Sequence, residues 1–152
     1  MDQDIRVFGT ELGRQALARN WAAVHALLAP WLRTRTSPDD IRRFFEDEYR
    51  VTLEENGVTG MFYPEHSEPQ LGGNSFMSAS DLRTPISFAN GKVRPLAPEV
   101  TDANVRYWMK MQLLCSPQQQ ERLAFDFFCE VWMAVVTTPE GLRVGYWSQG
   151  AY

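Results

Sequence analysis

Apolar and polar residues alternate with a period of two along the last third of the chain. From Leu123 to Val135 every second position is apolar, and the positions between them mix acids with large aromatics. Such alternation is typical of a β-strand that has one face in a core. The same pattern in residues 105–115 and 142–148, with a turn signal at residues 138–141, predicts three strands joined as an antiparallel meander. In the first of these strands, Val105 and Tyr107 are expected to share the apolar face.

The first half of the chain has helical spacing instead. Apolar residues recur every three or four positions in residues 5–17 and again in residues 21–28, as they do in amphipathic helices. Asn20 is a candidate N-cap, because Asn is favoured at that position. Pro30 is expected to end the second helical element.

A third helical element is predicted to begin at Ser37. Ser at the N-cap, Pro38 at the first helical position and Asp40 at the third resemble a capping box, with Asp in place of Glu. Phe44 and Phe45 follow within this helix, and its apolar side is expected to face the core.

The segment between these two halves is irregular. Residues 58–104 show little periodicity and contain five prolines, at positions 64, 69, 85, 95 and 98. Long segments of this kind often form a lid or an arm over a core. Helices first and a meander last predict an α+β fold in a single domain spanning residues 1–152, with the helices packed on one sheet face. Residues 58–104 would be an irregular, Pro-rich arm of that domain.

Composition refines this picture mainly by exclusion. The net charge is −4, and the arginines of residues 33–43 are interleaved with acids, so we expect no nucleic-acid partner. No apolar run approaches the roughly 18 residues of a membrane-spanning helix, and the acidic N-terminus is unlike a secretory signal. We therefore expect a cytoplasmic protein that does not bind membranes.

The sequence contains no catalytic or metal-binding signature. Cys115 and Cys129 are too far apart for a zinc motif, and the two histidines lack any ligand spacing. Asp126 and Glu130 would lie about 13 Å apart along a strand, which is too far for a pair acting on one bond. The sequence therefore predicts no metal, no cofactor and no catalytic residue that can be named.

Two parts of the chain resemble the nuclear transport factor 2-like superfamily, in a bacterial branch. One is the helical stretch of residues 17–30 followed by residues 32–40, and the other is the order of long strands at the C-terminal end. The resemblance covers about residues 5–49 and 105–147. It implies N-terminal helices packed on a strongly curved antiparallel sheet that forms a cone.

Members of this superfamily range from isomerases, dehydratases and epoxide hydrolases to non-catalytic binding and dimerisation modules. The resemblance implies that an enzyme of this kind would place acids, tyrosines or histidines inside the cone. Here the apolar strand faces offer the cone only Tyr107 and the two thiols as polar groups. A general base needs a positioned carboxylate or imidazole, so the interior is expected to be filled rather than reactive.

These observations favour a non-catalytic binding or interaction module over an enzyme. The strand face opposite the apolar one carries Trp108, Phe128 and Trp132. Tyr146 or Trp147 of the final strand joins them, and we name Trp147 as the candidate. Large aromatics exposed together usually mark a contact surface. Either the Pro-rich arm covers this face, or a second copy of the chain covers it in a homodimer.

A small apolar ligand is the other predicted partner. The candidate ligand-binding residues are Tyr49, Tyr63, His66, Tyr107 and Asp126. The same residues would serve the main alternative, a small-molecule isomerase or hydrolase with an apolar pocket inside the cone. A further alternative is an immunity or accessory protein that binds a single macromolecular partner.

Overall fold

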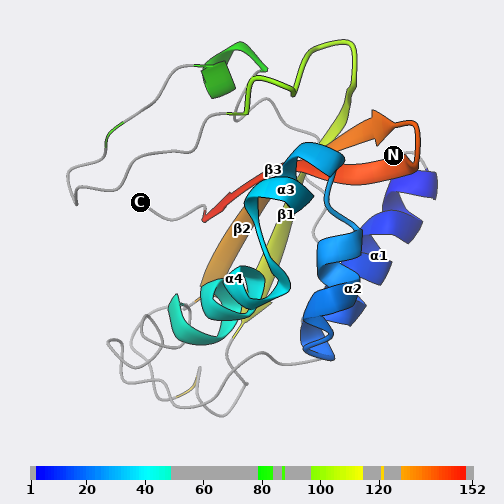
Figure 1. The fold of residues 1–152 in the computed structure, drawn as a ribbon. Helices are drawn as coiled ribbons and strands as arrows, with labels where there is room; N and C mark the ends of the chain where they lie inside the picture. The colour runs from blue at the N-terminus through cyan, green and yellow to red at the C-terminus, as the bar shows by residue number, and fades with distance from the viewer. Residues whose placement is uncertain are drawn as a thin grey trace.

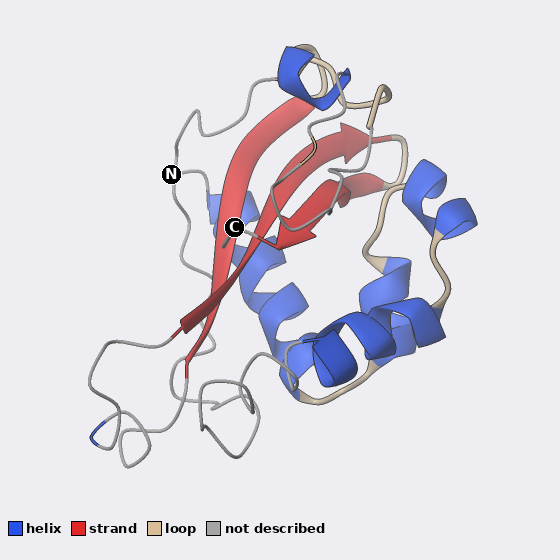
Figure 2. Ribbon diagram, turned by 90° about the vertical axis from the view of Figure 1, so that its left-hand side faces the viewer, coloured by secondary structure: helices blue, strands red, loops and turns tan. Residues whose placement is uncertain are grey.

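The chain folds into a helical layer packed on one face of an antiparallel sheet (Figures 1 and 2). The computed structural model describes residues 3–48, 79–83, 87, 97–114, 121 and 128–149. The predicted α+β class and the order of helices before strands are confirmed. The elements are α1 (Gln3–Leu17), α2 (Trp21–Ala26), α3 (Pro30–Arg35), α4 (Pro38–Arg42), the π-helix η1 (Arg43–Glu48), the 3-10 helix η3 (Ser80–Arg83), β1 (Val105–Leu114), β2 (Phe128–Thr138) and β3 (Gly141–Gln149).

Local sequence signals set the helix boundaries. Asn20 caps α2, since its side chain accepts a hydrogen bond from the backbone N–H of Ala23 at 3.3 Å. Ser37 and Asp40 form the predicted capping box at the start of α4, with N···O distances of 3.1 and 2.9 Å. The prediction that Pro30 ends the second helix is wrong, because Pro30 is the first residue of α3. The backbone N–H of the first helical residue has no acceptor within the helix. Proline, which lacks this N–H, is therefore well tolerated at that position.

The three strands form the predicted meander, in the order β1-β2-β3. Two irregularities decide which side chains share a face. Arg106 is an extra residue of β1 opposite β2, and Gly145 is an extra residue of β3 opposite β2. An extra residue reverses the alternation beyond it. The prediction that Val105 shares a face with Tyr107 is therefore wrong, because Val105 packs with Val136 on the opposite face.

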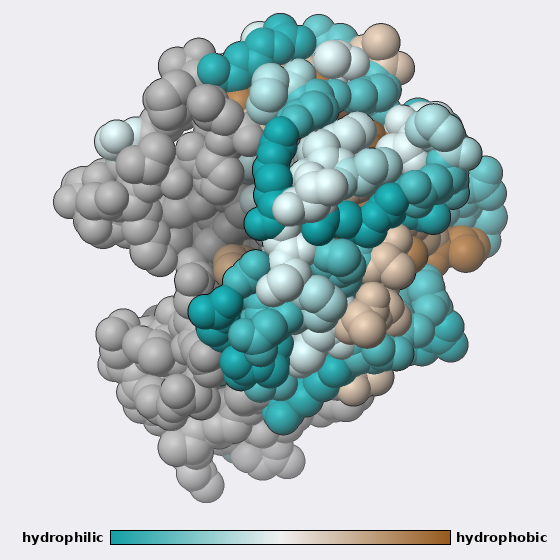
Figure 3. Space-filling view, viewed as in Figure 1, coloured by the Kyte–Doolittle hydropathy of each residue, from teal (hydrophilic) through white to brown (hydrophobic). Residues whose placement is uncertain are grey.

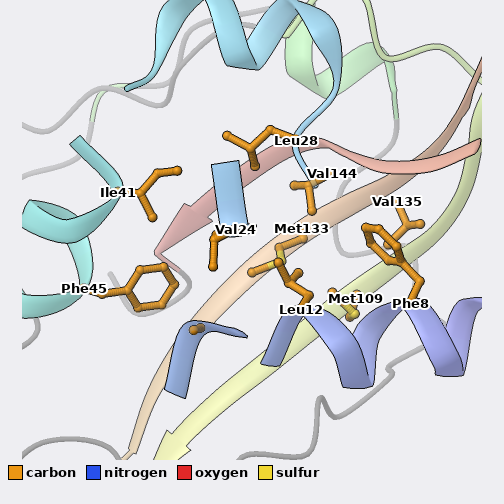
Figure 4. Packing of buried hydrophobic residues seen from close by; sticks show 11 residues of the cluster. Phe8, Leu12, Val24, Leu28, Ile41, Phe45, Met109, Met133, Val135 and Val144 are labelled. Atoms are coloured by element: carbon orange, nitrogen blue, oxygen red, sulfur yellow. The ribbon is translucent and has the colours of Figure 1, made fainter. Parts of the chain in front are cut away.

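The side of the sheet that faces the helices holds the main core (Figure 4). Met133 and Val135 of β2 point toward the helices, which confirms for these two members that the predicted apolar set lies in a core. Apolar side chains of the helices, at the predicted spacing, pack against these strand residues, and helix and strand residues together form one buried cluster. The buried members are Phe8, Leu12, Ala16, Val24, Leu28, Ile41, Phe45, Met109, Met133, Val135 and Val144.

The opposite sheet face is covered at one end by the same chain. Residues of η3 and of the segment 97–100 pack there, and η3 lies near the end of the sheet at which β1 begins (Figure 2). Trp31 and Trp108 pack against this second cluster. Parts of the predicted arm thus cover the half of this face that is nearer to Thr138. The buried members are Ala29, Ala79, Leu82, Ala97, Val100, Ala134, Val136 and Tyr146.

An ion pair fastens this cover to the helical layer. Arg35 of α3 donates to both carboxylate oxygens of Glu99, through Nη1 at 3.2 Å and through Nη2. These hydrogen bonds from Arg35 hold the pKa of Glu99 below its usual value. Because the pKa is lower in the folded state, the stabilisation is fully present above the unfolded pKa of about 4.3. It is lost as the pH falls through the lower folded value.

Glu99→Gln is therefore expected to make the protein less sensitive to acid. The wild type should lose about 0.2–1 kcal/mol more of its free energy of unfolding than the variant between pH 7 and pH 3. Urea titrations at both pH values measure this difference. Asp102→Asn removes an exposed carboxylate from the same segment and serves as the control. An equal acid sensitivity of the wild type and Glu99→Gln would contradict the prediction.

Candidate functional site

An open groove lies where the end of α3, the α4–η1 helix and the end of β3 meet. Five residues line it, Thr36, Asp40, Arg43, Phe44 and Trp147, and its volume is about 380 Å³. Figure 1 shows α4 in front of the sheet, close to the end of β3. Sites for small ligands typically have volumes of about 300–1,000 Å³. The groove therefore has the size of a small-ligand site.

The floor of the groove is aromatic. Phe44 and Trp147 stack with ring centroids 5.2 Å apart and an interplanar angle of 23°. Phe45 meets these two rings edge-on, at 5.2 and 5.8 Å, and stacks on Trp21 at 5.4 Å. Phe44 and Trp147 are half-buried, whereas Phe45 is buried. Two rings thus line the groove, and two more support them from the core side.

Both phenylalanines lie in the π-helical turn η1. In η1, Phe45 packs into the core next to Ile41, and Phe44 reaches the groove. Ile41, Phe44 and Phe45 have the i, i+3, i+4 spacing of an apolar stripe, and Phe44 also packs against the core from its half-buried position. Short π-helices are rare and occur frequently at functional sites. The backbone of Arg43–Glu48 therefore marks this region independently of the shape of the groove.

The rim of the groove carries opposite charges. Asp40 accepts hydrogen bonds from the backbone N–H of Ser37 and from Arg43. Nε of Arg43 lies 3.4 Å from a carboxylate oxygen of Asp39. The backbone hydrogen bond from Ser37 is the main cause that holds the pKa of Asp40 below its usual value. Asp40 is therefore ionised at neutral pH, and its side chain is 44% exposed beside that of Arg43, which is 56% exposed.

The groove combines aromatic rings with one carboxylate and one guanidinium group. Stacking and charge interactions of this kind bind and orient a planar or charged ligand. The surrounding surface is different in character. Figure 3 shows that hydrophilic residues dominate the described surface over the helices, with smaller hydrophobic areas between them.

His25 has a structural explanation. Its Nε2 lies 2.7 Å from the carbonyl oxygen of Thr36 and 3.2 Å from that of Arg33. Carbonyl oxygens only accept hydrogen bonds, so Nε2 carries the proton and donates it. The histidine thus satisfies carbonyl groups at the C-terminal end of α3, which would otherwise lack intrahelical partners.

Most of the predicted ligand-binding residues lie outside the described residues. This applies to Tyr49, Tyr63, His66 and Asp126, so their role stays a prediction. Tyr107 is described, and it is half-buried and packs against the helix-facing core. The structure therefore does not bring Tyr107 into the groove.

The aromatics predicted to form a partner surface do not share one face. Trp108 packs against the second cluster, whereas Trp147 packs against the helix-facing core and lines the groove. The extra residue Gly145 is the reason, because it turns Tyr146 rather than Trp147 toward the face of Trp108. This corrects the grouping of Trp147. The side chains of Phe128 and Trp132 lie outside the described part of the chain, and a homodimer through this face stays a prediction.

The sequence pattern did not identify the groove residues as a site. Asp40 was interpreted only as part of a capping box, and Phe44 as a member of the core-facing side of its helix. The spacing of Ile41, Phe44 and Phe45 is that of an ordinary apolar stripe, and Phe44 does pack against the helix-facing core, so it gave no signal of a groove. No local signal connects Asp40 or Phe44 with Trp147, which lies about one hundred positions further along the chain.

The described residues hold no group of three His, Cys, Asp or Glu side chains that could bind a metal ion. Within that same part of the chain, no helix has both the length and the apolar character needed to cross a membrane.

Comparison with known proteins leaves the family open. No protein-family model matches the chain, and neither a curated protein nor a solved structure matches it. The sequence resembles the nuclear transport factor 2-like superfamily, and the membership of the chain in that superfamily therefore stays a prediction.

Proposed function

We propose that this protein is a non-catalytic binding module of the nuclear transport factor 2-like type, and that it holds a small ligand with a planar apolar group. The observation that carries the proposal is the groove. Its aromatic floor, formed by Phe44 and Trp147, lies beside the ion pair of Asp40 and Arg43. A planar ligand can stack on such a floor while its polar group reaches the rim.

The packing of the described core supports a ligand at the edge of the helical layer. Met109 and Met133 are fully buried between the sheet and the helices, together with Leu12 and Val24. These apolar side chains fill the space that an internal cone pocket would need there. The ligand would thus bind where α4, η1 and β3 meet.

The supporting rings make the floor rigid. Phe45 is 1% exposed and contacts both Phe44 and Trp147, and Trp21 holds Phe45 from the other side. A second tie comes from Trp21, whose Nε1–H donates to Glu46 of η1 at 3.3 Å. Because these rings are held before a ligand arrives, less conformational entropy is lost on binding.

The experiment uses three probes that share one aromatic ring and differ in charge: benzyltrimethylammonium, benzyl alcohol and benzoate. We expect at least one of them to shift the NMR signals of the Phe44 and Trp147 backbone amides. Trp147→Leu keeps apolar volume but removes the flat ring. It should weaken that binding about two- to tenfold, because aromatic stacking contributes about 0.5–1.5 kcal/mol.

Trp108→Phe serves as the control, because Trp108 packs against the cluster on the other sheet face. It should leave the affinity for the probe unchanged. Circular dichroism of both variants establishes that they are folded. Binding that is equally tight in Trp147→Leu and the wild type would contradict the proposal, as would the absence of any shift with all three probes.

A further inference from the structure

We propose that the groove selects a small organic cation, such as an alkylated ammonium or a protonated aromatic amine. This inference rests on the proposed function, because it names the ligand class of the same groove. Two independent features of the groove point to a positive ligand. One is the balance of charge around the rim, and the other is the aromatic floor.

The charge around the rim is more negative than Arg43 alone suggests. Arg42 lies 2.9 Å from Asp39 and 3.5 Å from Glu46. Arg43 lies 3.4 Å from Asp39 and also pairs with Asp40. Of this group only Asp40 and Arg43 line the groove, and their charges balance. With Asp39, Arg42 and Glu46 behind them, three carboxylates face two guanidinium groups, which leaves one net negative charge among these described residues. Opposite charge attracts a ligand even in a partly solvated site.

The arrangement around Arg43 disfavours an anionic ligand. Its Nε lies near Asp39 and its Nη2 donates to Asp40, so the guanidinium group already serves two carboxylates. A ligand carboxylate that approached Arg43 would lie close to both acids and be repelled by them. An anion would therefore have to displace an existing ion pair. A cation at Asp40 would lie beside Arg43, so its attraction rests on the net charge of the whole group and on the aromatic rings.

The aromatic floor adds to the preference. The face of an aromatic ring carries partial negative charge, and tryptophan attracts cations more strongly than other aromatic side chains. Phe44 and Trp147 both line the groove, as does Asp40. Because the two rings stack on each other, a cation would lie over the outward face of one of them, close to one carboxylate. Aromatic rings next to an acid are a common means of recognising ammonium groups.

The test compares the same three probes in the wild type and in two matched variants. Asp40→Asn removes the charge but keeps a side-chain oxygen that can accept from the backbone N–H of Ser37, so the start of α4 is preserved. Asp39→Asn removes an equal charge from the same helical turn, at a residue that does not line the groove. Affinities come from NMR titrations.

We expect benzyltrimethylammonium to bind most tightly. Asp40→Asn should weaken its binding about fivefold, which corresponds to one unit charge at close range in water. The same variant should leave the affinity for benzyl alcohol within about twofold, and Asp39→Asn should have a smaller effect on the cation than Asp40→Asn.

Tighter binding of benzoate, lost in Arg43→Gln, would overturn the inference and leave the proposed function standing. Equal affinity for all three probes would overturn it in the same way, since the groove would then recognise the ring alone. If no probe binds, both the inference and the proposed function fail.

Discussion

Phe45→Ala is expected to lower the free energy of unfolding by about 3–5 kcal/mol. Phe45 is 1% exposed and belongs to the helix-facing core. Its ring contacts Phe44, Trp147 and Trp21, which come from three separate elements. Truncation to alanine loses the apolar burial and leaves a cavity among rings that cannot collapse freely. Typical domains are stable by about 5–15 kcal/mol, so this is a large share of the total.

Urea denaturation followed by circular dichroism measures the loss. Phe45→Leu keeps most of the apolar volume and should cost less than Phe45→Ala. If Phe45→Ala lost less than about 1 kcal/mol, the ring would not be packed as described.

Gly145→Ala is expected to destabilise the protein by about 1–3 kcal/mol through overpacking. A Cβ atom at this position would lie 2.7 and 2.9 Å from the two methyl carbons of Val136 and 3.2 Å from Cζ2 of Trp31. Carbon atoms in contact normally lie about 3.5–4.0 Å apart. Trp31 cannot withdraw easily, because its Nε1–H donates to the carbonyl oxygen of Gly145 at 2.8 Å.

A double variant makes this explanation specific. Val136→Ala removes the methyl carbons that the new Cβ would meet, so Gly145→Ala should cost less in that background than in the wild type. Thermal or urea unfolding of the two single variants and the double variant completes the cycle. Strictly additive losses would show that the collision is not the cause.

The secondary structure was predictable because its signals are local. Ile5, Phe8 and Leu12 recur at helical spacing, and all three are buried. The capping box at Ser37 involves residues only three positions apart. The alternation of Met133 and Val135 likewise identified the core-facing side of β2. Each of these patterns depends on neighbours within about four positions, which a sequence displays directly.

The candidate site was much less predictable. A period of two assumes an unbroken strand, and it missed the extra residues Arg106 and Gly145. Gly145 did carry a local signal, since an isolated Gly within a strand often marks a bulge, whereas Arg106 carried none. The extra residue Gly145 is what separates Tyr146 from Val144 and brings Trp147 to the groove. The π-helical turn of η1 was also not predicted, since Ile41, Phe44 and Phe45 fit an ordinary amphipathic helix.

Periodicity and capping predicted the helices around residues 5–17 and 21–28, the start of α4 and the three strands. They did not predict α3, and they left open which sheet face meets the helices. The tertiary structure alone decided that Trp147 stacks on Phe44, and that Leu82 and Val100 cover one end of the outer sheet face. The physical reason is the range of the interactions. Helical periodicity and capping act within one turn of chain. Strand register and the covering of a sheet face depend on the fit between side chains that are far apart in the sequence.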